Sequence, residues 1–501
     1  MNGNDVLMVS GSDSHGTPVT ITADEEGITP RDVFERSHAL FLEAWQKLGI
    51  TFDLFTHTDT ENHWAISQDF FKVLLEKKFL YKATEKQLYC ENDARFLPDR
   101  YITGECPICH FPRARGDQCD NCGNVLDATE IINPQCKLAK PGEPPHRLIV
   151  RETEHFYLDL PAFEKRLQEF LEDKTYWKPN VTTFVRNWLT GGLHGRAITR
   201  DLDWGIPIPQ PGYAGKCIYV WFEAVIGYYS ASVEWAKDRG TPDKWKEWWT
   251  KADNVRGYYF VAVWINDYLK AYDPDPLRFL LSANMPEFAD TDFTWKEFVR
   301  RNNDELIANW GNLANRVLTF TYKNFDQSVP TPGELNDADR ELIGKSEAAF
   351  ASVGDALDRV RFKEAIGITI ELARDANKYI ADNAPWFTIK TDRARAATTL
   401  YVALRVIDNL KTLFYPFLPF SSNDLHRQLG YQGDLLGKLE VKTFEESTRA
   451  HKALVYEPGD NSQKWAPSQL APGQRLGEPK ALFKKFDEKI AEEEKAKLGK
   501  Q

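Results

Sequence analysis

Two closely spaced Cys-x-x-Cys pairs constrain this chain more than any other feature of its sequence. They are Cys106 with Cys109 and Cys119 with Cys122, four of only seven cysteines in the chain. Thiolates at this spacing converge from two tight turns and offer Zn²⁺ a tetrahedral set of four ligands. Two disulfides or loose buried thiols are the alternative, but clustered pairs in a chain without secretory features favour a metal. We therefore expect one zinc, and because sulfur fills all four positions, the zinc is structural.

Length and charge bound the possible functions. A chain of 501 residues is too long for one core and indicates about three or four domains. The net charge of −11 argues against wholesale wrapping of nucleic acid but leaves room for a local RNA site. No basic leader and no run of about eighteen apolar residues is present, which predicts a cytoplasmic protein with no membrane contact.

The first candidate site lies near the beginning of the sequence. The apolar run 6–9 predicts a buried parallel strand that ends before Gly11. The polar loop 12–16 then follows the carboxyl end of this strand, where open α/β sheets place their ligands. Asp13 in this loop could hold an ammonium group, or it could merely cap the turn.

Hydrophobic periodicity predicts the next elements. Helices are expected from Pro30 to near Gly49 and from about Asn62 to Leu75. A strand is expected over 154–160, and the apolar run 218–222 predicts another.

The second half of the chain is predicted to be mainly helical. Apolar residues at helical spacing form three stripes that predict a helical bundle over 296–450. The first comprises Leu306, Trp310, Leu313, Val317 and Phe320; the second Ile366, Ile370, Ala373, Asn377 and Ile380; the third Val402, Val406, Leu410 and Leu413. A Pro- and Gly-rich linker (456–479) leads to a predicted charged helix with Leu482, Phe483, Phe486 and Ile490 on one side. The sequence does not decide whether that helix packs on the body or stays in solvent.

These stretches together resemble the methionyl-tRNA synthetases. The resemblance covers nearly the whole chain and rests on the cysteine pairs and on Ser10–Pro18, Arg95–Arg100, Tyr219–Tyr228, Asp273–Arg278 and Asn383–Trp386. It implies an α/β plus all-α fold. A Rossmann-like class I core is split by a zinc-bearing connective peptide and followed by a helical-bundle anticodon-binding domain. It also implies methionine, ATP and tRNA(Met) as substrates.

The resemblance implies a methionine site in the core. Asp13 resembles the carboxylate that binds the methionine ammonium group, and Trp221, Ala224, Val225 and Tyr228 resemble the wall of the side-chain pocket. Aromatic rings contact a thioether sulfur favourably, which suits such a wall. Trp221 and Tyr228 as plain core aromatics are the alternative.

The helical domain carries the implied anticodon site. Asn312 and Arg316, one helical turn apart, match the family's anticodon-reading cluster together with Pro385 and Trp386. Asn and Arg can hydrogen-bond a splayed base, and Trp can stack on it. A helix-capping Asn and a packing Trp are the alternative.

Cys90 and Cys136 are the remaining cysteines of the zinc region. Some family members carry a second zinc knuckle at these places, but Asp93 and Ala139 stand here where its other two thiolates would be. Asp93 could supply an oxygen ligand. One zinc remains the expectation, and a second stays open.

Two family signatures for ATP are absent from this sequence. No His-x-Gly-His-type segment precedes Val6, and no Lys-Met-Ser-Lys-Ser-type loop separates 257–261 from 264–270. Catalytic residues therefore cannot be assigned, and we expect little or no activation of methionine. The core is expected to be truncated and internally deleted, with exposed sheet edges that a partner protein or an oligomer could cover.

Three functions compete on these grounds: a methionine–tRNA ligase with impaired activation, a non-catalytic tRNA-binding module, and a zinc-stabilised scaffold. The core is expected in two segments, residues 1–60 and residues 216–265, with the connective peptide between them over residues 61–215. A stem-contact segment over 266–295, the anticodon domain over 296–450, and a linker with a terminal helix over 451–501 are expected to follow.

Overall fold

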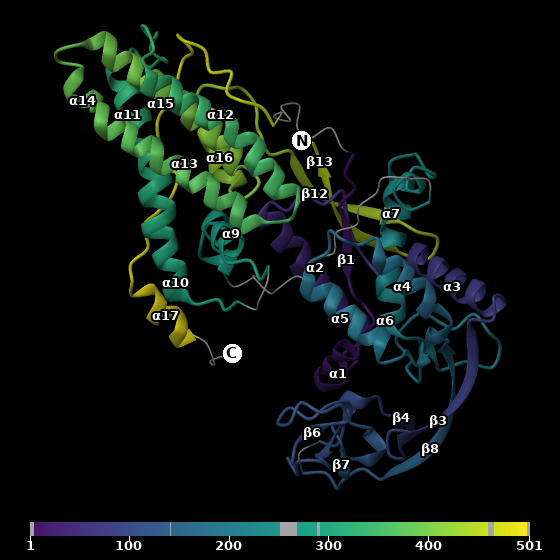
Figure 1. The fold of residues 1–501 in the computed structure, drawn as a ribbon. Helices are drawn as coiled ribbons and strands as arrows, with labels where there is room; N and C mark the ends of the chain where they lie inside the picture. Colours follow the sequence, from purple (N-terminus) through teal and green to yellow (C-terminus); the bar gives the residue numbers. More distant parts are fainter. Residues whose placement is uncertain (1–4, 141, 251–267, 288–290, 459–464, 498–501) are drawn as a thin grey trace.

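A four-stranded sheet lies at the centre of the structure and joins two strands near the N-terminus to a hairpin from residues 438–457 (Figure 1). Its strands lie in the order β1-β2-β13-β12. Strand β1 (Val9–Ser12) runs parallel to β2 (Leu54–His57), with Val9 opposite Leu54. The structure is a computed structural model and describes residues 5–140, 142–250, 268–287, 291–458 and 465–497.

The other half of this sheet is a hairpin from the C-terminal region of the chain. Strands β12 (Lys438–Glu445) and β13 (Ala450–Glu457) pair antiparallel, and β13 pairs antiparallel with β2, where Leu454 lies opposite Phe55. The helical domain was predicted to extend to residue 450, but strand β12 begins at residue 438. Because β13 takes up the edge of β2, the chain itself covers that edge.

Helices pack on both sides of the central sheet. They are α2 (Pro30–Leu48) on one face and α7 (Gly227–Asp238) on the other. Helix α1 (Thr17–Glu26) packs on α2, α3 (Glu61–Glu76) packs on α7, and α6 (Val220–Glu223) lies just before α7 in the chain. As predicted, α2 begins at Pro30 and ends before Gly49, which adopts a left-handed φ of 65°. A capping box between Thr29 and Asp32 satisfies its first N–H groups. Its apolar side packs with Phe55 and Leu454 from the sheet.

A long antiparallel ribbon connects the sheet to the cysteine-rich region, residues 91–147, which we call the knuckle module (Figure 1). The ribbon consists of β3 (Leu80–Cys90) and β8 (Leu148–Leu158), so the strand expected over 154–160 is longer than predicted. The module contains β4 (Arg95–Phe96), β5 (Ile102–Glu105), β6 (Ala114–Arg115) and β7 (Ile132–Cys136). Helices α4 (Glu164–Glu172) and α5 (Pro179–Thr190) and strands β9 (Arg196–Ala197), β10 (Thr199–Arg200) and β11 (Cys217–Ile218) lead back to the core.

The predicted helical bundle is present beside the sheet (Figure 1). Its helices are α9 (Pro274–Ala283), α10 (Trp295–Arg300), α11 (Asn312–Asn324), α12 (Asp337–Asp358), α13 (Phe362–Asn383), α14 (Pro385–Thr388), α15 (Arg393–Phe414) and α16 (Pro419–Gln428). Most residues of the three predicted stripes form its core, with Trp310, Ala373 and Val406 fully buried, whereas Phe320 and Asn377 are only partly buried. Within the described residues of the chain, no helix has the length and apolar character needed to cross a membrane.

The C-terminal segment packs back onto the body, which the sequence left open. Leu482 and Phe483 pack on the bundle core, and the Phe486 ring lies 5.1 Å from that of Phe298. The helix predicted from Leu482 is wrong, because only α17 (Ile490–Lys497) is helical here. The segment instead gains its contacts from single aromatic side chains that insert between helices.

Two predicted strands differ from the structure. The first strand runs from Val9 to Ser12, so it begins after Val6 and continues past Gly11. It was predicted to be buried, but only Ser12 is buried, Val6 is exposed, and in the described residues β1 pairs with β2 alone. The run 218–222 is wrong as a strand, because the chain turns at Tyr219 into α6. The α6–α7 region puts Trp221, Val225 and Tyr228 at helical spacing, which overrides the strand preference of the aromatic run.

Candidate functional site

The loop after β1 is held by hydrogen bonds from two other regions of the chain. The Ser14 backbone N–H donates to Thr58 Oγ1 (2.9 Å), and the Asp59 N–H donates to Ser14 Oγ (3.1 Å). Trp204 Nε1 donates to the Ser14 carbonyl (2.7 Å). Ser14 is fully buried, so these bonds fix the backbone on either side of Asp13 and His15.

A chain of ion pairs crosses the base of this loop. His15 Nδ1 lies 2.9 Å from Glu223 Oε1, and His63 Nε2 lies 2.8 Å from Glu223 Oε2. His15 Nε2 lies 3.6 Å from Asp59 Oδ1 on the other side. Because Glu223 is on α6, these contacts hold α6 against the loop that carries Asp13. The sequence prediction included none of these groups, although His15 stands two residues after Asp13.

Burial and the neighbouring carboxylates shift the pKa values of two residues in the loop, Asp13 and His15. Asp13 is exposed at the surface, but the protein packed around its carboxyl group and then the negative charge of Glu223 raise its pKa to about 6, while His15 opposes the rise. Burial lowers the pKa of His15, but the Asp59 and Glu223 carboxylates outweigh it and raise that pKa to about 9. His15 is therefore a cation at neutral pH, and the carboxylate of Asp13 is mostly ionised there.

The four expected wall residues follow one another along the helical stretch that begins with α6. Trp221 and Val225 are exposed, at 69% and 63% of their full surface, while Ala224 and Tyr228 are partly buried. Glu223, between them, points the other way and is fully buried against His15 and His63. Trp221 and Val225 therefore present open apolar surface on a helix that is anchored beside the Asp13 loop.

A second expected cluster lies on the helical bundle. The Arg316 guanidinium lies 4.9 Å from the centre of the Trp386 ring, which brings α11 and α14 together. Pro385 begins α14 and is buried, after Ala384 turns the chain with a φ of 36°. Asn312 is exposed on α11, on the same face as Arg316.

Two further side chains belong to this surface and were missed. Asn377 on α13 accepts a hydrogen bond from Arg316 Nη2 (3.3 Å), although the sequence placed it in an apolar stripe. Phe387 follows Trp386 and is 68% exposed. The bundle thus presents the Trp386 ring, the Arg316 guanidinium and the Asn377 amide side by side on one surface.

The four predicted cysteines come together in the knuckle module. Cys106 Sγ lies 4.0 Å from Cys122 Sγ, and Cys109 Sγ lies 3.5 Å from Cys119 Sγ. Four sulfurs at about 2.3 Å from a zinc ion are separated by about 3.8 Å, so this set fits Zn²⁺. The Asn124 backbone N–H and then its side-chain Nδ2, which donates to Cys122 Sγ (3.2 Å), lower the pKa of that thiol to about 6.

A second group of potential ligands lies in the same module. Cys90, Asp93, Cys136 and His146 bring one donor atom each to within 4.8 Å of one another. His146 was missed, because it lies ten residues after Cys136, outside any knuckle spacing.

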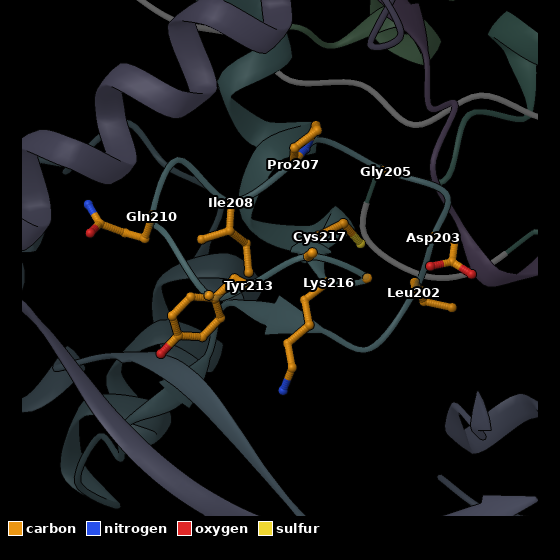
Figure 2. Close-up of a pocket in the computed structure, with 12 residues that line it drawn as sticks. Leu202, Asp203, Gly205, Pro207, Ile208, Gln210, Tyr213, Lys216 and Cys217 are labelled. Atoms are coloured by element: carbon orange, nitrogen blue, oxygen red, sulfur yellow. The ribbon is translucent and has the colours of Figure 1, made fainter. Parts of the chain in front are cut away.

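A surface cavity of about 360 Å³ lies in the loop 202–217 (Figure 2). Two of its polar side chains are engaged with neighbours, since Lys216 Nζ lies 3.1 Å from Asp201 Oδ1 and Tyr213 donates a hydrogen bond to Glu154. Cys217 in its floor is buried, and burial raises the pKa of its thiol to about 12. This cavity lacks a reactive group poised for chemistry.

Two known protein families match the chain, one over each half. The family described as tRNA synthetases class I (M) matches residues 1–262 and 260–318. The family described as anticodon binding domain of methionyl tRNA ligase matches residues 329–455.

Relatives match over almost the full length. The chain is 47% identical to the methionine–tRNA ligase of Thermomicrobium roseum over 548 residues, with 99% of the chain and 93% of the relative covered. It is 45% identical to that of Roseiflexus sp. strain RS-1 over 556 residues, with the same coverage. The first alignment is longer than the 501 residues of the chain, so the relative has residues without a counterpart here.

Solved structures share the fold. The Mycobacterium tuberculosis methionyl-tRNA synthetase bound by methionyl-adenylate aligns with a TM-score of 0.71 at 21% identity. The alignment covers 96% of this chain and 92% of that protein.

Proposed function

The chain belongs to the methionyl-tRNA synthetase family, and we propose that it is a methionine–tRNA ligase whose own activation step is strongly impaired. The family reaction joins methionine to AMP with release of pyrophosphate and then transfers methionine to tRNA(Met). The observation that carries the proposal is the match of family and relatives over 99% of the chain. The division into core, connective peptide and anticodon domain expected from the sequence belongs to the proposal, except that the β12–β13 hairpin joins the core sheet.

In this proposal, methionine binds beside the loop after β1. The Asp13 carboxylate accepts hydrogen bonds from the α-ammonium group, and the thioether lies against the wall formed by Trp221, Ala224, Val225 and Tyr228. The 2.9 Å contact between His15 and Glu223 supports this arrangement, because it keeps both halves of the site adjacent. Sulfur–aromatic contact then favours methionine over smaller apolar amino acids.

The impairment follows from a loop that is missing from the sequence near the end of the second core segment. Adenylate formation is accelerated mainly by positive charge and hydrogen-bond donors arranged around the phosphates. Losing one preorganised donor costs about 3–4 kcal/mol, and this sequence has no Lys-Met-Ser-Lys-Ser-type loop at all. The expected position of the loop, near Ala262 and Val263, lies outside the residues that the structure describes. The class I (M) family matches the chain in two stretches, 1–262 and 260–318. These stretches meet at 260–262, which supports an internal deletion there.

The four-cysteine site would hold one structural Zn²⁺. The sulfur separations fit a tetrahedral ion, and all four positions are thiols, so the metal would fold the module and leave no open position for a reacting water. Cys106, Cys109, Cys119 and Cys122 are its proposed ligands.

A second candidate function is tRNA binding without catalysis. It is favoured by the surface around Asn312, Arg316, Pro385 and Trp386, where a guanidinium lies over a tryptophan ring. An anticodon base could stack there and be read by the amides. This function depends on the bundle alone and survives the loss of activation.

ATP–pyrophosphate exchange tests the proposed impairment, and binding of tRNA(Met) tests the second function. We expect no detectable methionine-dependent ATP–pyrophosphate exchange by the chain, measured beside the Thermomicrobium roseum enzyme as a positive control. Exchange at a rate near that of the control would contradict the proposed impairment. Binding of tRNA(Met) without exchange would favour the second function over a third, a scaffold with neither activity.

A further inference from the structure

A fully buried carboxylate lies at the base of the proposed methionine site. It belongs to Glu223 on α6, and two imidazoles each hold one of its oxygens. His15 Nδ1 lies 2.9 Å from Oε1, and His63 Nε2 lies 2.8 Å from Oε2. We propose that Glu223 is a positioning residue for amino-acid binding, which acts through His15 to set the place and the charge of the Asp13 carboxylate. This role rests on the methionine site proposed above.

His63 is itself fixed by another helix. Its Nδ1 lies 2.7 Å from Ser230 Oγ on α7. The Ser230 hydroxyl donates to the Gly227 carbonyl (3.1 Å), so His63 Nδ1 is the donor in the first contact. An ionised carboxylate can only accept, so His63 Nε2 donates to Glu223 as well. The carboxylate is thus held by α3 and, through His63, by α7, and its place does not depend on the Asp13 loop.

His15 transmits this fixed position to the loop. Its ring is buried and packs against Trp204 and Trp64, whose ring centres lie 5.4 and 6.2 Å away. The other nitrogen of His15, Nε2, lies 3.6 Å from Asp59 Oδ1. Asp13 precedes His15 by two residues and is exposed, so its carboxylate can meet a ligand while the backbone beside it is anchored. A shift of the imidazole would therefore move Asp13.

The same carboxylate sets the direction of the proposed side-chain wall. Residues two apart point to roughly opposite sides of a helix, and Trp221 and Val225 stand two residues to either side of Glu223. Glu223 is fully buried, whereas Trp221 and Val225 are exposed. The two histidines therefore hold the inner side of α6 while its outer side forms the wall. Because the distance from Asp13 to this wall must match the length of one amino acid, Glu223 links both parts of the site.

Glu223 also affects the protonation of Asp13. Burial raises the pKa of Glu223, but its hydrogen bonds with His15 and His63 outweigh burial and lower that pKa, so the group is ionised. After the protein packed around the Asp13 carboxyl group, the negative charge of Glu223 is the next largest cause that raises the pKa of Asp13. The charges of His15 and His63 lower it. Neutralising Glu223 should therefore lower the pKa of Asp13.

The remaining charges of this cluster surround Asp59. Arg31 of α2 and Arg449 of the β12–β13 turn both pair with it, at 2.6 and 2.8 Å. Because Asp59 also contacts His15, this imidazole keeps one carboxylate partner when Glu223 is neutralised. A loosened site would also lower the pKa of Asp13, since less protein would surround its carboxyl group. A neutral variant and a shortened variant are therefore compared.

Calorimetric titration of the full chain with methionine between about pH 4.5 and 8 tests this role. In E223Q we expect the acid loss of affinity, which begins near pH 6 in the wild type, to move down by about half to one pH unit. E223D keeps the charge but is one methylene too short to reach both histidines. Its acid loss should stay in place while its affinity at neutral pH falls about tenfold. E234Q is the matched control, because Glu234 is a buried carboxylate of α7 that pairs with His451; it should keep the acid loss and the affinity of the wild type.

Different results would contradict this role and the proposed function. A wild-type chain that binds no methionine at any pH would contradict the methionine site and the role of Glu223 together. Binding by the wild type with an unmoved acid loss in E223Q, or with equal shifts in E223Q and E223D, would overturn the role of Glu223 alone. If circular dichroism shows E223Q to be unfolded, E223D decides, since wild-type affinity in E223D would show that contact with both histidines is not needed.

Discussion

Arg449 and Asp59 lie 390 residues apart in the chain, and their Nη2 and Oδ1 atoms are 2.8 Å apart in the fold. Asp59 is fully buried and also pairs with Arg31 Nη1 at 2.6 Å. Asp59 also faces His15 at the base of the Asp13 loop. The turn of the β12–β13 hairpin therefore supplies the positive charge of Arg449 to the carboxylate that contacts this loop. Ser447 and Thr448 of the same turn donate their N–H groups to Glu61.

Replacing Arg449 by Met should destabilise the core. Removing one partner of a buried ion pair costs about 3–5 kcal/mol, and because Arg31 still pairs with Asp59 we expect about 1–3 kcal/mol. Urea unfolding followed by tryptophan fluorescence measures the change. Methionine binding, followed by equilibrium dialysis, should weaken in the same variant because the loop loses its support.

The same hairpin offers a control. Arg239 pairs with Glu457 at 3.1 Å near the molecular surface, and R239Q should change the unfolding free energy by less than about 1 kcal/mol. Equal losses in R449M and R239Q would show that the hairpin contributes only general packing.

Alkaline pH should loosen the hairpin through His451. Its Nε2 lies 2.7 Å from Glu234 Oε1, and although burial lowers its pKa, the Glu234 and Glu446 carboxylates raise it to about 9. The folded pKa lies above the unfolded value of about 6.5, so the stabilisation is full below pH 6.5 and is lost as pH rises through about 9. Unfolding free energies measured between pH 6 and 10 should fall by roughly 1–3 kcal/mol, and less in H451Q.

The position of the β12–β13 hairpin could not be predicted from the sequence, whereas several other features could. The helical stripes, the ends of α2 and the four-cysteine group depend on neighbours within a few turns, and they were predictable from local spacing. The pairing of β13 with β2 joins residues about four hundred apart, and no local pattern encodes it. His146 reaches Asp93 only through the register of β3 with β8, and the helix at Trp221 forms against a strand-like run because Glu223 is buried between two histidines.

Methionine affinity should decrease in acid because of Asp13. Its pKa is raised to about 6, so the carboxylate that binds the ammonium group is protonated as pH falls through 6. Below that value we expect affinity to fall about tenfold per pH unit, and to change little between pH 7 and 8. Calorimetric titration with methionine from pH 5 to 8 measures this. D13N should bind weakly at every pH; a D13N profile identical to the wild type would exclude Asp13 from the site.

Trp386→Ala should weaken binding of tRNA(Met). Stacking of a base on an aromatic side chain is worth about 1–3 kcal/mol, so we expect a loss of about tenfold to a hundredfold in affinity, measured by filter binding. Arg316→Lys should cause a smaller loss, since it keeps the charge but not the planar group over Trp386. Trp188 on α5 is 53% exposed and lies outside the bundle, so W188A is the control. Equal affinity of the wild type for a tRNA with another anticodon would contradict anticodon reading.

Removing zinc should unfold the knuckle module and leave the bundle intact. Structural zinc supplies folding energy directly, and the small sheet β6-β5-β7 has a core of few apolar residues around Cys106 and Cys119. In C106S, or after treatment with a strong chelator, we expect rapid proteolysis within 91–147 while the fragment that contains α11–α16 resists. Binding of tRNA(Met) through the bundle should change less than about threefold, because Arg316 and Trp386 lie on helices whose core is separate from the module. Simultaneous loss of tRNA binding and bundle protection would instead mean that the zinc stabilises the whole chain as one cooperative unit.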